Sequence, residues 1–321
     1  MSITTLKGAA AAFAESQDAE QLLGSPTALW KTTLRRLLRR KTGVIGLILI
    51  GTMMSIAVAA PLLAPYDPMQ VLIGIEDVKK RTPPCIHLLG CDETKPQHIL
   101  GTDGNVRDLF SRIIYGARVS LSIGFTAVGF AVIFGVTQGA IAGFWGGGGW
   151  PDNLIMRIMD VILGFPSLLL AIAIVAVLGP GLRNALLAIA IVTLPAYARV
   201  MRASVLSIKE LDYVAASRAL GASRMRILLV RVVPNAMTPI VVLSSLGIAS
   251  AILDAAGLSF LGLGAQPPKP EWGTMLGSER NQVFNAPHLV FFPGIAIMIT
   301  VLGFNLLGDG LRDALDPRLN D

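Results

Sequence analysis

The sequence predicts an all-α membrane protein with six transmembrane helices. Charged residues make up only 15% of the 321 residues, and hydrophobic residues make up 53%. Soluble domains carry about 25% charged residues, because they need a charged surface where a membrane domain exposes aliphatic side chains to lipid. Glycine, with 33 residues, and proline, with 19, are both frequent. Both are tolerated in membrane helices that pack closely against neighbours.

Six apolar segments are each long enough to cross about 30 Å of hydrocarbon, which takes about 20 residues. The predicted spans cover residues 43–63, 119–145, 154–178, 182–206, 237–263 and 290–307. Arg157 and Asp160 lie in the third span, and their spacing of three residues on one helix predicts that they pair with each other. Arg199 and Arg202 lie toward the end of the fourth span, and Asp254 interrupts the fifth.

Lysine and arginine residues concentrate on one side of this topology. One basic cluster precedes the first span and another follows the fourth, so both fall on the same side of a six-span chain. The clusters contain Lys31, Arg35, Arg36, Arg39, Arg40 and Lys41, and then Lys209, Arg218, Arg224, Arg226 and Arg231. Because loops rich in lysine and arginine stay in the cytoplasm, we expect both termini to be cytoplasmic.

The segment 1–42 is predicted to be cytoplasmic and to end in an amphipathic elbow helix. It shows no apolar core with a cleavage site, so no secretory signal is recognised. Ser25 and Pro26 are typical of a helix start. Apolar residues then share one face, with the arginines on the other: Trp30, Leu34, Leu37 and Leu38. This pattern favours a helix on an anionic inner leaflet over a DNA-binding helix, because membrane orientation already requires basic residues beside a span.

The cytoplasmic loop over residues 207–235 is predicted to contain a short helix. Asp212 is a candidate N-cap for a helix over 213–220, and Gly221 stands where the residue after a helix end is expected. Ser223 is a candidate cap for a second helix, which Pro234 is expected to interrupt before the next span. The first helix carries small residues that would let another protein approach its backbone: Ala215, Ala216, Ser217 and Ala219.

This loop resembles the "EAA" loop of permeases in ATP-binding-cassette importers. In that pattern Glu-Ala-Ala is followed after three residues by Gly and then by an apolar stretch ending in Leu-Pro. Ala215, Ala216 and Ser217 stand at the Glu-Ala-Ala positions, Gly221 stands at the glycine, and 233–234 stand at the Leu-Pro. The chain lacks the glutamate, so a salt bridge from that residue to an ATPase is absent, although Glu210 and Asp212 lie close by.

Further segments resemble the dipeptide/oligopeptide/nickel branch of this family, and within it the C-type permease. The matching segments are 101–103, 107–108, 111–112, 115–118, 162–170, 257–264, 266–273 and 304–318. The resemblance runs from about residue 30 to the end, whereas residues 1–25 and about 70–100 match no known pattern. Val106 stands where the family usually has glycine, which predicts a different turn before Arg107.

The resemblance implies a type I ABC importer permease fold in the cell (inner) membrane. The predicted parts are the N-terminal segment 1–42, a first helix over 43–64, an extracytoplasmic region over 65–118, a core domain over 119–307 and a cytoplasmic tail over 308–321. The implied partners are a second permease subunit forming a heterodimer, two cytoplasmic ATPase subunits or domains, and an extracytoplasmic substrate-binding protein. The implied cargo is di- or oligopeptides carried by alternating access, with nickel or another small solute as the alternative.

The resemblance also assigns roles to residues. The short helix and its flank are implied to dock in the ATPase and to transmit its closure to the pore, through Asp212, Tyr213, Ala215, Ala216, Ser217, Arg218 and Gly221. For Asp254 two readings stay open: it lines the translocation path and receives the amino terminus of the peptide, or it makes a hydrogen bond between helices.

The chain itself is not expected to be an enzyme or to hold a cofactor. No Gly-x-x-x-x-Gly-Lys-Ser/Thr segment is present, and the glycine run 146–149 is followed by Trp150 and Pro151 with no lysine. ATP and Mg²⁺ are therefore expected on the partner subunits. A secondary transporter or channel is the alternative of a different class, but it would carry paired ionisable groups or broken helices near the bilayer midplane, and the sequence indicates neither.

Both cysteines, Cys85 and Cys91, lie in the long predicted outer region. Because that side of the membrane faces an oxidising compartment, a disulfide between them is the first expectation. Free thiols are the next alternative. A metal site that adds His87 and His98 is the least favoured, because the spacings match no standard zinc pattern.

Overall fold

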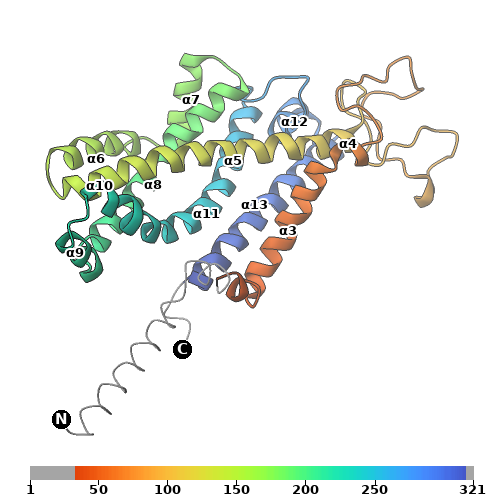
Figure 1. The fold of residues 1–321 in the computed structure, drawn as a ribbon. Helices are drawn as coiled ribbons and strands as arrows, with labels where there is room; N and C mark the ends of the chain where they lie inside the picture. The colour runs from red at the N-terminus through yellow and green to blue at the C-terminus, as the bar shows by residue number, and fades with distance from the viewer. Residues whose placement is uncertain (1–32, 316–321) are drawn as a thin grey trace, which may run out of the picture.

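The chain folds into a bundle of helices, and the computed structural model describes residues 33–315 (Figure 1). Five helical stretches in this range are long and apolar enough to cross a membrane. They are α3 (Lys41–Val58), α5 (Leu109–Ile141) with a π turn (Ala142–Gly146), α8 (Leu182–Ile208), α10 (Arg224–Ile227) joined through a π turn (Leu228–Val232) to α11 (Val233–Phe260), and α13 (His288–Leu315). The predicted all-α membrane fold class is confirmed.

A sixth span exists only if the bent pair of α6 (Trp150–Leu163) and α7 (Ser167–Leu178) is counted as one. The two helices meet at 92°, so the prediction of one continuous third span is wrong. Pro166 directly precedes α7 and Gly164 directly follows α6. A proline lacks the N–H that would continue the helical hydrogen bonds, and it disfavours helical geometry in the residue before it. The chain therefore breaks between these two residues.

Two other helices are longer than the spans that their apolar runs predicted. α5 begins ten residues before the predicted start at residue 119, because the side chain of Asp108 caps it by accepting a hydrogen bond from the N–H of Ser111 at 2.8 Å. α13 continues to Leu315, past the predicted end at residue 307. Pro234 does not interrupt the helix that leads into α11, because the wider π turn lies directly before it and the helix continues.

α8 packs along α5 through a row of small residues. On α5 and its π turn every fourth residue is alanine or glycine and is buried: Ala127, Ala131, Gly135, Gly139 and Gly143. A Cβ atom added to Gly135 would meet the Cβ of Tyr197 at 2.7 Å, and one added to Gly143 would meet the side chain of Val205 at 2.9 Å. Small residues at this spacing let two membrane helices approach backbone to backbone.

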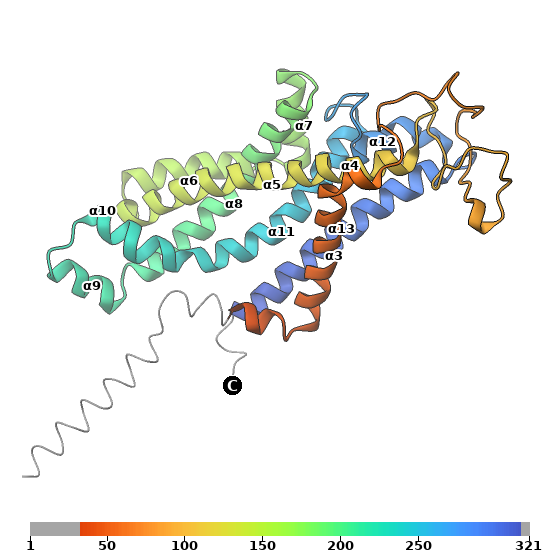
Figure 2. The same cartoon turned by 45° about the vertical axis from the view of Figure 1, so that its right-hand side comes forward.

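The two ends of the bundle differ in structure. α9 (Asp212–Ala219) lies beside α10 at one end, whereas α12 (Trp272–Glu279), the short helix α4 (Ala60–Leu63) and the loops over residues 64–108 gather at the opposite end (Figure 2). These loops hold one 3₁₀ turn (His87–Leu89), and another (Arg280–Gln282) follows α12. We call these the α9 end and the α12 end.

Part of the predicted elbow helix falls within the described residues. Residues 33–37 are helical, and Leu37 is buried against Gly43 at the start of the first span. Leu34 and Leu38 are exposed, as expected of side chains that would face lipid. Trp30 and residues 316–321 of the predicted tail lie outside the described range.

Candidate functional site

α9 stands almost free of the bundle. Val214 is the one buried residue of α9, with no exposed surface, while Ala215, Ala216 and Arg218 are exposed and Ser217 is half-buried. Asp212 and Tyr213 are exposed as well. An isolated eight-residue helix is marginal in water, so a helix with one buried side chain presents a surface that is suited to contact with another protein.

The end of α9 is a defined turn. Gly221 has φ +80, the N–H of Gly221 donates to the carbonyl of Arg218 at 3.0 Å, and the N–H of Ala222 donates to the carbonyl of Ser217 at 3.1 Å. This is the Schellman arrangement that the glycine predicted. Ser223 caps the next helix, as predicted, by accepting from the N–H of Arg226. Asp212 does not cap α9: it lies in the first turn, and Leu211 is the N-cap residue without a side-chain bond.

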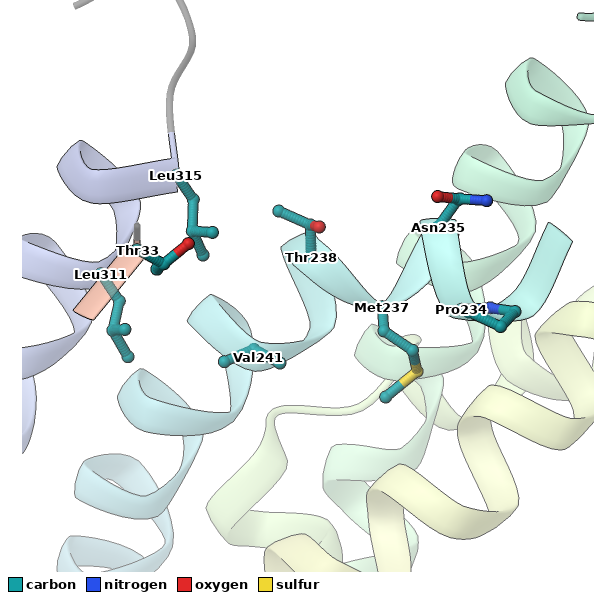
Figure 3. Close-up of a pocket in the computed structure, with 8 residues that line it drawn as sticks. All are labelled: Thr33, Pro234, Asn235, Met237, Thr238, Val241, Leu311 and Leu315. Carbon is teal, nitrogen blue, oxygen red and sulfur yellow. The ribbon is translucent and has the colours of Figure 1, made fainter. Parts of the chain in front are cut away.

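Tyr213 connects α9 to the helix that follows it. Its hydroxyl donates to the carbonyl of Arg231 in the π turn at 3.4 Å, and the side-chain amide of Asn235 donates to both oxygens, at 3.4 Å and 2.6 Å. Asn235 also borders an apolar groove between the ends of α11 and α13 (Figure 3). The groove is lined by Thr33, Pro234, Asn235, Met237, Thr238, Val241, Leu311 and Leu315. Tyr213 and Asn235 therefore link α9 to the π turn and to the start of α11.

Asp254 lies on α11 and is half-buried. Within residues 33–315 no side chain or backbone group makes a hydrogen bond or salt bridge with its carboxyl group. The structure thus gives no hydrogen bond between helices to Asp254 from the described part of the chain.

The charges of the third and fourth spans are joined across helices. Asp160 pairs with Arg199 of α8, so the predicted pair of Arg157 with Asp160 is wrong. The reason is that α8 lies beside α6 and supplies a guanidinium, while Arg157 is exposed. A second pair joins Asp152 to Arg202 through two parallel hydrogen bonds, with Nη2 to Oδ2 at 2.6 Å. Asp152 is a buried acid that the sequence reading missed, although an acid in the first turn of a helix signals a stabilising role.

A buried ionic cluster fixes the start of α5 at the α12 end. Asp103 pairs with Arg107 at 2.8 Å and with Arg112 at 3.4 Å, and all three side chains are at most 10% exposed. Arg112 also donates to the carbonyls of Pro68 and Pro268, at 2.8 Å and 3.2 Å. In the sequence these residues stand out only as part of the family resemblance. Their alternation of acid and base over ten positions was the available signal.

Val106 lies in the turn of this cluster with φ +56. This left-handed conformation is uncommon for residues other than glycine and costs a β-branched residue about 1–2 kcal/mol. The turn therefore keeps a glycine-like conformation with valine in it, and Val106 is 1% exposed. The prediction that this turn differs from the turn of the family stays a prediction.

His98 connects the loops of the α12 end to α5. Its Nδ1 lies 2.9 Å from the carboxylate of Asp108, its Nε2 lies 3.2 Å from Glu76, and its side chain is 1% exposed. Burial disfavours the charged imidazolium, but Asp108 and Glu76 outweigh that effect, and the pKa of His98 is raised above its ordinary value. Burial, followed by the neighbouring Glu76, raises the pKa of Tyr66 to about 12. The ring of Tyr66 packs against that of His98, with the centroids 5.1 Å apart and the planes tilted by 32°.

Cys85 and Cys91 are joined by a disulfide, with their Cα atoms 5.4 Å apart. His87 and His98 do not converge on them: His87 Nε2 contacts the carbonyl of Lys95 at 2.8 Å, and His98 is held by the two carboxylates. In residues 33–315 no three His, Cys, Asp or Glu side chains are grouped so that they could hold a metal ion.

Two family models match the chain. Residues 135–321 match the model described as the binding-protein-dependent transport system inner membrane component. Residues 28–84 match the N-terminal TM domain of oligopeptide transport permease C. The second of these models covers the predicted first span, and the first covers most of the predicted core domain.

Named relatives cover most of the chain. The dipeptide transport system permease protein DppC of Alkalihalophilus pseudofirmus is 48% identical over 90% of both chains. The di/tripeptide transport system permease protein DppC of Pseudomonas aeruginosa is 49% identical over 86% of this chain and 88% of that protein. The glutathione transport system permease protein GsiD of Pectobacterium atrosepticum is 44% identical over 90% of this chain and 91% of that protein.

A solved structure shares the fold. An inward-facing form of the MetNI methionine ABC transporter matches 64% of this chain and 97% of its own with a TM-score of 0.53. The sequence identity is 19%, so this similarity is evidence for the fold alone.

Proposed function

The chain belongs to the family of binding-protein-dependent transport system inner membrane components, and from that premise we propose that it forms half of the translocation pore of an ATP-driven peptide importer. The exposed helix α9, in which Val214 is the one buried residue and Tyr213 bonds to the π turn before α11, is the observation that carries the proposal. An element of this kind receives force from a partner protein. Three relatives named for transport of dipeptides, di/tripeptides and glutathione support a peptide cargo over nickel or another small solute.

The permease subunit works with partner ATPases, which hydrolyse ATP in this family, and with a binding protein. The finer arrangement that we propose has two ATPase subunits at the α9 end, a second permease of similar fold across the pore, and a binding protein at the α12 end. The α9 end then lies in the cytoplasm with both termini. ATP and Mg²⁺ are bound by the ATPases. Closure of the ATPases moves α9, and through Tyr213 it moves α11, so that access to the pore alternates between the two sides.

Replacing Ala216 with arginine is expected to abolish coupling without unfolding the chain. Ala216 is exposed on α9, and arginine is a good helix former, so the helix itself tolerates it. A bulky charged side chain in the docking surface should reduce ATP-driven uptake of a labelled dipeptide about tenfold or more. Uptake by the full complex in proteoliposomes and co-purification of the ATPases measure this effect.

The matched control is Ala216→Ser, which keeps a small side chain and should retain both uptake and co-purification. If the arginine variant still co-purifies with ATPases and imports the dipeptide at the wild-type rate, α9 is not the coupling element. If the wild-type complex imports no peptide at all, the cargo assignment fails, and nickel or another small solute becomes the candidate.

We assign Asp254 to the wall of the translocation path, where its carboxylate would receive the amino terminus of the peptide. A charge placed within a membrane span is costly unless it faces water or a partner, and no partner lies within residues 33–315. Asp254→Asn removes the charge and keeps the size. Uptake is expected to fall about tenfold while the complex stays assembled, since a hydrogen bond to a charged group contributes about 1.5–3 kcal/mol. Wild-type uptake by an intact Asp254→Asn complex would rule out this role.

A further inference from the structure

One ion pair within the spans is open to its surroundings. The side chain of Asp160 on α6 is 59% exposed, and that of its partner Arg199 on α8 is 52% exposed. The neighbouring pair is different, because Asp152 is only 2% exposed and both of its oxygens are bound by Arg202. The buried pair joins the two helices, so the exposed pair is not needed for that purpose.

The exposed pair lies on two helices that are counted among the membrane spans, namely α8 and the α6 part of the bent pair. Arg199 precedes the end of α8 at Ile208 by nine residues, which corresponds to about 14 Å along a helix. A charged side chain in contact with lipid at the bilayer centre costs about 2.5–3.5 kcal/mol. Contact with a second protein chain would instead require that both charges lose their water, which is also costly. A water-filled path avoids both costs.

A cavity opens on the same face. It has a volume of about 360 Å³ and is lined by Asp152, Asn153, Met156, Asp160, Arg199 and Arg202. The four residues from α6 recur at helical spacing along one side of that helix. Asp160 also lies one turn before the break at Gly164 between α6 and α7. Substrate sites in membrane transporters often form at such broken helices, where backbone groups are freed from helical bonding.

Both members of the pair have unused hydrogen-bonding capacity. Nη2 of Arg199 donates to Oδ1 of Asp160, and among residues 33–315 neither side chain has another partner. The Nε and Nη1 donors of Arg199 are suited to a carboxylate, and Oδ2 of Asp160 is suited to an ammonium group. A short peptide with free ends carries one of each.

We propose that this face of α6 and α8 is part of the wall of the translocation path, and that Asp160 and Arg199 bind the ammonium and carboxylate groups of a peptide as it passes. This site rests on the proposed function, because it needs a peptide cargo. It lies on different helices from Asp254. The Asp160–Arg199 pair and Asp254 would then be two weak charged sites along one path. Several weak sites let a zwitterionic peptide advance without being trapped at one of them, as they do for ions in channels.

The test uses the assembled complex in inside-out membrane vesicles without ATP, so that the peptide reaches the path from the α9 end and no binding protein is needed. Met156 lines the cavity one turn from Asp160, and Ile158 is 50% exposed on another side of the same helix. Each is replaced by cysteine, and its reaction rate with a charged methanethiosulfonate reagent is measured. The native cysteines are joined in a disulfide and do not interfere.

Met156→Cys is expected to react, and Ile158→Cys to react at least about tenfold more slowly, because a lipid-facing thiol is not ionised to the reactive thiolate. Millimolar dialanine should slow the reaction of Met156→Cys severalfold, while N-acetyl-dialanine amide, which has no charged ends, should not. Adding Asp160→Asn or Arg199→Gln to Met156→Cys should remove the protection. A purely structural ion pair predicts no protection in any of these variants.

Three results would overturn the proposal. The first is an unreactive Met156→Cys, which means that the face is covered by lipid or by the second permease. The others are labelling of Met156→Cys that dialanine does not slow, and protection by N-acetyl-dialanine amide that equals protection by dialanine. ATP-driven uptake by the wild-type complex is measured in parallel. If the wild type imports dipeptide but protection is absent, this site alone is wrong. If the wild type does not import dipeptide, the proposed function itself fails.

Discussion

Replacing Gly139 with leucine is expected to prevent α8 from packing along α5 and to remove most of the folded protein from the membrane. A Cβ atom at this position would collide with the backbone carbonyl of Ala198, and it would lie 2.8 Å from the Cβ of Met201. The carbonyl belongs to a helix and cannot rotate away. The cost should therefore lie at the upper end of the about 1–3 kcal/mol that overpacking takes, or above it.

Gly129→Leu provides the matched control for this substitution. Gly129 lies on the same helix, and no atom is within 4 Å of the position that its Cβ would occupy. Both variants gain the same helix propensity, so they differ only in the contact with α8. Size-exclusion profiles and thermal unfolding of the purified protein in detergent should show loss of Gly139→Leu and retention of Gly129→Leu. Equal behaviour of the two variants would mean that the small-residue row does not determine the packing.

Asp103→Asn is expected to destabilise the α12 end by about 3–5 kcal/mol, because it leaves the buried guanidinium groups of Arg107 and Arg112 without their carboxylate. The asparagine retains the shape and can still accept from backbone N–H groups, so charge is the main loss. Limited proteolysis of the loops over 64–108 should become faster, and the melting temperature should fall.

Asp77→Asn is the control for the loss of charge, since Asp77 is exposed in the same loops and makes no hydrogen bond or ion pair within residues 33–315. It should behave as the wild type. A melting temperature for Asp103→Asn that equals that of Asp77→Asn would show that the two arginines do not need the charge of Asp103, and that the carbonyls of Pro68 and Pro268 are sufficient for Arg112.

The sequence was sufficient where a signal was local. The apolar runs located the helical spans, and Gly221 and Ser223 located the end of α9 and the start of α10, because each acts on backbone groups within a few residues. The family resemblance rested on long ungapped segments and was confirmed by relatives that cover about 90% of the chain. The roles of the α9 residues and of Asp254 stay predictions.

The sequence failed where the deciding contact was distant. Arg199 competes with Arg157 for Asp160 only because α8 lies beside α6, and no spacing along α6 shows this. The break at Pro166 was misjudged for a different reason. An apolar run fits a straight span and a bent one equally well, and proline is tolerated within α8, α11 and α13, so its presence alone did not predict a 92° bend.

Under the proposed coupling we expect the continuous helical stretch Arg224–Phe260 to work as a lever. Its 37 residues measure about 55 Å along the helix at 1.5 Å per residue, so a small displacement of α9 that is passed on through Tyr213 is expected to become a larger displacement at Phe260. The π turn at Leu228–Val232 and Pro239 are two places along this stretch where a helix can bend. How far the Phe260 end of the stretch moves for a given displacement of α9 therefore depends on which of these two places bends. Stiffening either one should alter how far the pore opens for each ATP consumed.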